Sequence, residues 1–279
     1  MIKQKPIWSP DKDYLQKTQM FQFMKKMGMQ DYNELHRWSV DHFEDFWKEM
    51  LKFSGIIYQG LEDPVIHPDK KEPITPGGHF FPEIKLNFAE NLLRFRDNQT
   101  ALVSITESRR TLRYSYKKLF TTVSQVASSL RKMGVHPEDC IAGFLPNASE
   151  AVISMLAVTS LGAAWSSCSP DFGVRGVLDR FGQIKPRVLF TVNAYIYNGK
   201  KFDCLEKIEK IVQSIPEIEK VVIIPFVKDH PSELPGLKEK VITWNNFLDP
   251  SAKTLTFLRF PFNHPLYIMY SSGTTGIPK

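Results

Sequence analysis

Hydrophobic and polar positions follow two different patterns along the chain. In residues 32–53, apolar and aromatic side chains recur every three or four positions, which predicts one amphipathic helix or two short ones. We expect Asp41 or Ser39 as an N-cap and Gly55 as the end of this pattern. Aromatic residues at helical spacing favour core packing over a ligand cage.

Residues 60–82 contain several prolines and a Gly-Gly pair, so they are expected to form a loop. Helical spacing resumes in residues 87–95. Glu90 follows Asn87 by three positions, which is compatible with a capping box. The first hundred residues therefore predict a helical segment.

From Thr100 onward the pattern alternates between strands and helices. The expected strands are residues 101–105, 112–114, 140–145, 163–167, 188–192 and 220–224, and the expected helices are 115–133, 149–161, 174–184 and 202–214. Ser115 is a predicted N-cap, and Gly134 a predicted helix end. This alternation predicts an α/β fold, a mostly parallel sheet with helices on both faces, preceded by the helical segment.

Proline becomes frequent again in residues 225–262, where we expect loops around an isolated strand at 241–244. This stretch is interpreted as the connection to a second lobe, whose first strand is 266–270. The predicted domains are a helical N-terminal segment, 1–98, and an α/β domain that begins at residue 99 and continues to 279.

The chain has 279 residues, 42% of them hydrophobic and 24% charged, which is ordinary for a globular protein with a real core. Its formal charge of +6 is spread without a long basic block. A solvated basic surface is therefore favoured over nucleic-acid binding. The positive net charge is also compatible with small anionic substrates such as nucleotides.

Cys140, Cys168 and Cys204 are far apart and lack the spacing of a zinc site or a disulfide framework. They suit a reducing cytosol, and no metal-ligating residues are predicted. The N-terminus has no apolar signal region, and no run of about 18 apolar residues occurs. Neither secretion nor a membrane span is expected.

The chemistry that stands out lies in residues 270–279, Tyr-Ser-Ser-Gly-Thr-Thr-Gly-Ile-Pro-Lys. Two glycines let the backbone approach an anion, four hydroxyls can donate hydrogen bonds, and Lys279 adds a positive charge. This composition suits the phosphates of a nucleoside triphosphate. The common P-loop pattern does not fit, because a proline precedes the lysine. The alternative is an ordinary flexible connector.

Ligands of parallel sheets bind beyond the carboxyl ends of the strands. Three segments take that position here: the loop after Tyr270, Pro146-Asn147, and residues 169–172. All are candidate rims of a binding crevice. For Pro146-Asn147, a simple turn is the alternative.

Through its lysine, the 270–279 segment resembles the phosphate loop of the AMP-forming adenylating enzymes. Residues 32–55, 85–92 and 162–174, the last continued by 176–181, resemble the acetyl-CoA-synthetase branch of that family and, within it, the ligases that act on acetoacetate. The similarity runs nearly from end to end.

This resemblance implies a ligase. The acetoacetate carboxylate would attack the α-phosphate of ATP to give an acyl-adenylate and pyrophosphate, and the thiol of CoA would then displace AMP. The residues implied to hold the β- and γ-phosphates with Mg²⁺ are Ser271, Ser272, Gly273, Thr274, Thr275 and Gly276. Lys279 is the implied catalytic residue, since it would offset the charge of the departing pyrophosphate.

Relatives carry basic side chains near the CoA phosphates after the strand expected at 188–192. Lys200 stands at such a position here, although a solvated helix start is an equal alternative. Family members continue well past this loop, so we expect the N-terminal part of a cytosolic ligase, inactive by itself. The alternatives are a short inactive product that acts as a binding or regulatory partner, and a ligase for another short-chain carboxylic acid.

Overall fold

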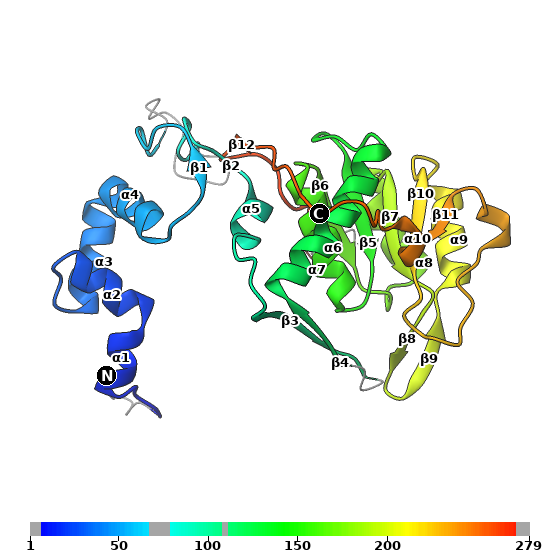
Figure 1. Cartoon of the computed structure of the whole chain (residues 1–279), viewed down its shortest axis with the longest axis horizontal. Coiled ribbons are helices and arrows are strands. Elements are labelled where there is room, and N and C mark those ends of the chain that lie inside the picture. The colour runs from blue at the N-terminus through cyan, green and yellow to red at the C-terminus, as the bar shows by residue number, and fades with distance from the viewer. Residues whose placement is uncertain (1–6, 67–78, 108–110, 272–279) are drawn as a thin grey trace. The chain divides into compact units, whose positions relative to one another are not determined.

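The computed structural model describes residues 7–66, 79–107 and 111–271, and the chain divides into two compact units (Figure 1). The helical unit comprises Met1–Ile56 and Gly60–Ile84, and the α/β unit comprises Ile57–Gln59 and Lys85–Lys279. Among the described residues, no helix is both long and apolar enough to span a membrane.

The helical unit contains four helices in its described residues: α1 (Lys12–Lys17), α2 (Gln19–Lys26), α3 (Tyr32–Asp41) and α4 (Phe43–Phe53). Residues 32–53, for which the periodicity predicts one helix or two, form the two helices α3 and α4. The expected cap at Ser39 or Asp41 is wrong. Asp31 caps α3 by accepting a hydrogen bond from the backbone N–H of Glu34, while α4 begins after His42 without a side-chain cap.

Aromatic side chains form the core of the helical unit. Phe23 is buried, with its ring centroid 5.0 Å from that of Phe53 and 6.0 Å from that of Phe46. Trp38 packs edge-on against Phe46. The aromatics of residues 32–53 therefore serve packing, as their spacing predicts.

The α/β unit has a longer series of elements. Its helices are α5 (Phe88–Leu92), α6 (Tyr116–Lys132), α7 (Ser149–Ser160), α8 (Val174–Ile184), α9 (Leu205–Ser214) and α10 (Trp244–Phe247). Its strands are β1 (Tyr58–Gln59), β2 (Lys85–Leu86), β3 (Thr100–Ile105), β4 (Thr111–Ser115), β5 (Cys140–Phe144), β6 (Ala164–Cys168), β7 (Val188–Val192), β8 (Ala194–Tyr197), β9 (Lys200–Asp203), β10 (Lys220–Ile224), β11 (Val241–Thr243) and β12 (Phe260–Pro261). The expected α/β fold is confirmed.

The main sheet of this unit has the strand order β11-β10-β7-β5-β6, and all its described pairs are parallel. The chain moves from β5 to β6 in one direction and from β6 to β7 in the other. Right-handed crossovers therefore place α7 on one face and α8 and α9 on the opposite face. The helix contacts agree, since α6 packs on α7 and α8 on α9.

Burial explains why these strands are nearly continuous apolar runs. Every residue of β7 is buried, as are four of the five in β5 and in β10. Covered on both faces, such strands do not alternate between apolar and polar residues. Ser115 caps α6 as predicted, accepting from the N–H of Lys118, and Gly134 after the helix adopts φ +74°.

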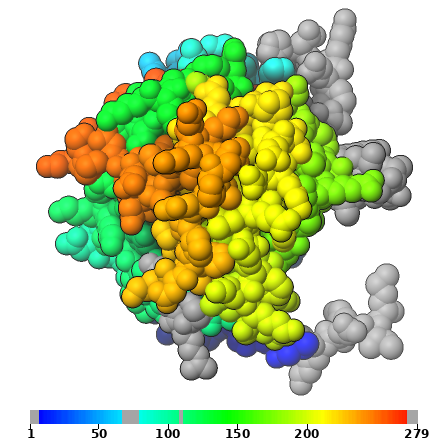
Figure 2. All heavy atoms as spheres, turned by 90° about the vertical axis from the view of Figure 1, so that its right-hand side faces the viewer, coloured from blue at the N-terminus to red at the C-terminus, as the bar shows by residue number. Residues whose placement is uncertain are grey.

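Three expectations about the chain after β7 need correction. Helix α9 begins at Leu205 rather than 202, because residues 194–203 form the antiparallel hairpin β8–β9. The strand at 241–243 is not isolated, since β11 pairs in parallel with β10 and closes one side of the main sheet. In Figure 2, the orange segment that includes β11 covers the middle of one face, beside α9 in yellow.

The third correction concerns residues 266–270, which were expected to begin a second lobe. They form no regular strand there, but a single parallel bridge joins Tyr267 to Trp165 of β6. The segment therefore lies along the free side of the same sheet.

A small sheet, β1-β2-β12, lies within the α/β unit beside α5. Asn87 caps α5 by accepting from the N–H of Glu90, which is half of the expected capping box. The other half is replaced, because the Glu90 carboxylate receives two hydrogen bonds from Arg259, at 2.8 and 2.9 Å. This pair fastens α5 to the chain just before β12.

Candidate functional site

The topology of the main sheet creates a crevice at one edge. After β5 the chain turns toward α7 on one face, and after β7 it continues to α9 on the other. The loops that leave these two neighbouring strands therefore diverge, which is the topological switch point where doubly wound sheets bind ligands. Pro146 and Asn147 follow β5 at this point, and Asn193 follows β7.

Residues 266–270, which precede the expected phosphate loop, run along β6 toward the carboxyl ends of the strands. The N–H of Trp165 donates to the carbonyl of Leu266 at 3.0 Å, and the N–H of Ile268 donates to the carbonyl of Trp165 at 2.9 Å. The Ser166 hydroxyl adds a bond to the Ile268 carbonyl at 2.8 Å. Because this segment runs parallel to β6, Tyr270 lies toward the carboxyl end of that strand. Residues 272–279, including five of the predicted loop residues and Lys279, lie outside the described residues.

Arg180 of α8 supports the last described turns of that segment. Its guanidinium carbon lies 4.4 Å from the ring centroid of Phe172 and 5.9 Å from that of Tyr270, so the cation faces two aromatic rings. The hydroxyl of Tyr270 donates to the carbonyl of Arg180 at 2.7 Å. Arg180 therefore links Phe172, in the expected rim 169–172, to Tyr270, the first residue of the expected phosphate loop.

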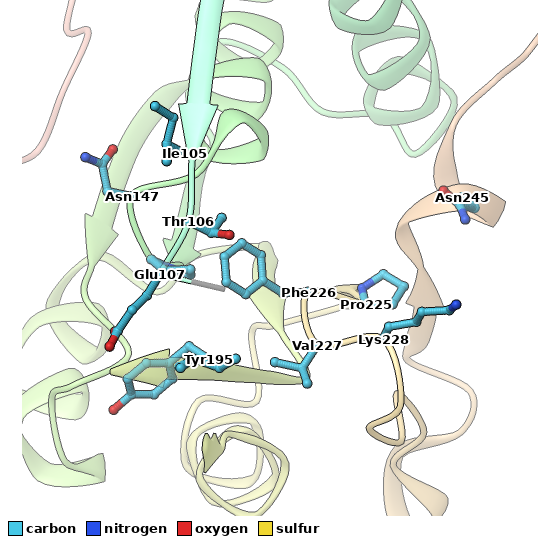
Figure 3. Close-up of a pocket in the computed structure, with 12 residues that line it drawn as sticks. Ile105, Thr106, Glu107, Asn147, Tyr195, Pro225, Phe226, Val227, Lys228 and Asn245 are labelled. Carbon is cyan, nitrogen blue, oxygen red and sulfur yellow. The ribbon is translucent and has the colours of Figure 1, made fainter. Parts of the chain in front are cut away.

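A pocket of about 590 Å³ opens at the switch point (Figure 3). It is lined by Ile105, Thr106, Glu107, Pro146, Asn147, Tyr195, Ile196, Pro225, Phe226, Val227, Lys228 and Asn245. Aromatic and aliphatic surface thus combines with a few amide, hydroxyl and charged groups, as is typical of small-molecule sites. The structure brings the predicted rim Pro146-Asn147 into this pocket, whereas residues 169–172 lie outside its lining.

Asn193 fixes one wall of the pocket, although its sequence context gave no sign of this role. Its side chain is buried and makes five hydrogen bonds. The amide nitrogen donates to the carbonyls of Val227 and His230, at 3.0 and 2.9 Å. The amide oxygen accepts from the N–H groups of Ala194, Phe226 and Val227. The loop after β10 is therefore tied to the end of β7.

The β8–β9 hairpin contributes Tyr195 and Ile196 to the pocket and carries Lys200. The rings of Tyr195 and Phe202 stack across the hairpin with centroids 5.2 Å apart. Lys200 is exposed, opposite Tyr197 in the strand pairing, and its predicted alternative as a helix start is wrong. The Asn198-Gly199 pair between aromatic residues is a strong hairpin signal and could have predicted this element.

Burial shapes the ionisation of the groups near this edge. Loss of solvent, and secondarily Asp171, raises the pKa of Tyr195 to about 12. Burial also raises the pKa of Cys168 to about 11 and that of Cys204 to about 12. These thiols are protonated at neutral pH, so neither offers a thiolate nucleophile. Among the described residues, no three histidine, cysteine, aspartate or glutamate side chains gather as a metal site.

A parallel sheet with a pocket at its switch point defines a class of α/β protein that binds ligands beyond the carboxyl ends of its strands. The family model described as AMP-binding enzyme matches residues 88–279, and the chain belongs to this family.

Similar proteins of known name are CoA synthetases. The chain is 41% identical to acetoacetyl-CoA synthetase of Macaca fascicularis over 98% of its own length and 42% of the relative. It is 37% identical to acetoacetyl-coenzyme A synthetase of Rhizobium meliloti over 100% of the chain and 43% of that relative. A malonamoyl-CoA synthetase of Penicillium aethiopicum is 38% identical over 94% of the chain and 38% of the relative.

The structure resembles that of acetoacetyl-CoA synthetase from Streptomyces lividans, with a TM-score of 0.90 and 33% identity over 99% of this chain and 43% of that one. The chain therefore spans less than half the length of these relatives.

Proposed function

We propose that this chain forms the N-terminal part of a ligase that activates acetoacetate with ATP and transfers it to CoA. The principal support is the combination of family membership with near-complete alignment to acetoacetyl-CoA synthetases. The parallel pairing of residues 266–268 with β6 adds a physical reason, because the described chain runs toward the ligand-binding ends of the strands just before the expected phosphate-loop sequence.

In the proposed reaction, a carboxylate oxygen of acetoacetate attacks the α-phosphorus of ATP, and the bond to the pyrophosphate oxygen breaks. The CoA thiolate then attacks the acyl carbon of the adenylate, and AMP leaves. Such chemistry depends on positioning and charge neutralisation.

The phosphate loop supplies much of that neutralisation in this proposal. Residues 271–276 offer hydroxyls, glycines and backbone N–H groups, a donor set that fits the β- and γ-phosphates, with hydroxyl oxygens available to Mg²⁺. Lys279 would act as the catalytic residue by balancing the charge that accumulates on the departing pyrophosphate. Bound Mg²⁺ would supply further charge neutralisation.

Lys200 would contact the phosphates of CoA. It lies on the exposed strand β9, directly after the turn of the hairpin that leaves the switch point. The proposed division is 1–98 before the AMP-binding domain and 99–279 as the first part of that domain, whereas the match to the family model begins at residue 88. A reducing cytosol suits the three free cysteines of the chain.

The acyl group is the least constrained part of the proposal. A malonamoyl-CoA synthetase is among the relatives at 38% identity, so another short-chain carboxylic acid is the second candidate substrate.

The test uses the native protein, captured with an antibody against the helical unit, and measures carboxylate-dependent exchange of pyrophosphate into ATP. Acetoacetate should support the fastest exchange, ahead of malonamate and acetate. Faster exchange with another acid would make that acid the proposed substrate in place of acetoacetate. The absence of exchange with every acid would favour a non-catalytic partner role.

A matched pair of variants tests the catalytic role of Lys279. Lys279→Ala should slow exchange by about 10²–10³-fold, because it removes a group directed at developing charge. Lys253→Ala removes an equal charge at an exposed position and should leave the rate unchanged. Equal rates in the two variants would exclude the catalytic role of Lys279.

A further inference from the structure

The turn of the β8–β9 hairpin holds an anion supplied by the protein itself. Asn198 and Gly199 both adopt left-handed backbone conformations, with φ of +49° and +70°. Their N–H groups donate to the two carboxylate oxygens of Glu107, at 3.0 Å from Asn198 and 2.7 Å from Gly199. Successive N–H groups in a turn form a concave anion site, and here each carboxylate oxygen receives one of them.

Glu107 reaches this turn from a distant part of the chain. It follows the end of β3, and 91 residues separate it from Asn198. In Figure 3 it descends from β3 along one side of the pocket. The contact therefore connects the β3–β4 ribbon to the tip of the hairpin beside the switch-point pocket.

The hairpin needs such a connection because its own pairing is short. Strands β8 and β9 pair over four residues each, and all four residues of β9 are exposed. A two-stranded hairpin of this kind is marginally stable in water. Charge-assisted hydrogen bonds at its tip therefore have a large influence on where the tip, and Lys200 after it, lie.

We propose that Glu107 is a positioning residue: its carboxylate anchors the turn at Asn198 and Gly199 and thereby sets where Lys200 presents its ammonium to the phosphates of CoA. This inference rests on the proposed role of Lys200. In this proposal Glu107, which also lines the switch-point pocket, acts on CoA recognition through the position of Lys200.

The first experiment measures the anchor without any ligand. Exchange of the Asn198 and Gly199 amide protons with water is followed by NMR in the purified 279-residue chain. Glu107→Ala should accelerate exchange at both amides at least tenfold, and Glu107→Gln, which retains one acceptor oxygen, should accelerate it less. Glu138→Gln changes an exposed glutamate of the same unit and should have no effect. Unchanged exchange in Glu107→Ala would overturn the proposal.

The second experiment asks whether the anchor serves the ligand, using the native enzyme. Glu107→Ala should raise the KM for CoA several-fold, by more than it changes the KM for ATP, and Glu107→Gln should partly restore the KM for CoA. A general structural defect would lower kcat or change both KM values equally. A fall in the KM for CoA would mean that Glu107 repels the ligand, and would also overturn the proposal.

Lys200→Ala separates failure of this inference from failure of the proposed function. If Lys200→Ala raises the KM for CoA and Glu107→Ala does not, the positioning role is wrong while the role of Lys200 stands. If Lys200→Ala has no effect, the proposed CoA contact fails and the positioning role fails with it. Wild-type exchange of pyrophosphate into ATP still tests the ligase assignment independently.

Discussion

The two units of this protein hold their structures together in different ways. The α/β unit buries whole strands, including all five residues of β7, between helices on both faces of the sheet. The helical unit buries a small cluster around Phe23, Met24 and Leu35, and ion pairs such as Lys26–Glu49 at 3.0 Å join its helices at the surface. A buried polar group costs free energy unless it is hydrogen-bonded, and the larger core provides more backbone groups that can serve as partners.

That difference explains where the candidate chemistry lies. The α/β unit places Asn193 in full burial and satisfies its donors and acceptors with loop backbone. Its pocket is shaped by such polar contacts at the sheet edge. In the described residues of the helical unit, the buried positions are hydrophobic. Four substitutions test the contrast, in order of decreasing effect.

Removal of a central ring should have the largest effect. Phe190 of β7 is fully buried against Trp165, Trp244 and Phe247. Phe190→Ala should lower the free energy of unfolding of the α/β unit by about 3–5 kcal/mol, since it leaves a cavity that the sheet cannot close. Denaturation followed by hydrogen exchange resolves the two units.

The matched control is Phe23→Ala, which should accelerate exchange in α2 and α4 while leaving β5 and β10 unchanged. Loss of protection in both units from either substitution would show that the two cores are not independent.

Loss of the buried amide should come next. Asn193→Ala removes all five side-chain hydrogen bonds, including those to the His230 carbonyl and the Val227 N–H, while the Val227 carbonyl and the Phe226 N–H each keep a backbone bond. The substitution should cost a total of about 2–3 kcal/mol after the loop relaxes. Chemical denaturation measures the loss. Asn246→Ala, at an exposed position, should cost little. Equal effects of the two would mean that the loop after β10 is held by other contacts.

The pair between Arg259 and Glu90 should have a smaller effect. Arg259→Gln removes both hydrogen bonds to the carboxylate, which is largely buried, and should cost about 1–2 kcal/mol because the guanidinium is itself partly exposed. The Leu86 and Phe260 amides, which flank this contact in the small sheet, should exchange faster. If Lys253→Gln has the same effect, loss of positive charge and not the pair is responsible.

The smallest effect should depend on pH. Hydrogen bonds from Lys132 at 2.8 Å, then Ser128 and Ser251, hold the pKa of Asp249 well below its usual value. Because the pKa is lower in the folded state, this contribution is present above the unfolded pKa of about 4 and is lost as the pH falls further.

The free energy of unfolding of Asp249→Asn should therefore lie below that of the wild type at pH 7, and the gap should narrow below pH 4. A gap that is constant with pH would exclude the ionised carboxylate as its cause.

The sequence by itself determined the elements whose signals are local. Periodicity located α3 and α4, and the strong apolar runs located β5, β7 and β10, because burial on a helix face or inside a sheet requires those patterns wherever the partner lies. It also carried the phosphate-loop residues and the resemblance to adenylating enzymes. The roles of Lys200 and residues 271–279 stay predictions.

Only the tertiary structure decided contacts between residues far apart in the chain. The pairing of β11 with β10, the position of residues 266–268 beside β6, and the bonds of Asn193 and Glu107 all depend on groups tens of residues away. An asparagine after a strand, or a glutamate in a turn, has the same local signal whether or not distant parts of the chain hydrogen-bond to it. Its hydrogen-bond partners are specified by the fold, and so is the wall of the pocket that those bonds hold in place.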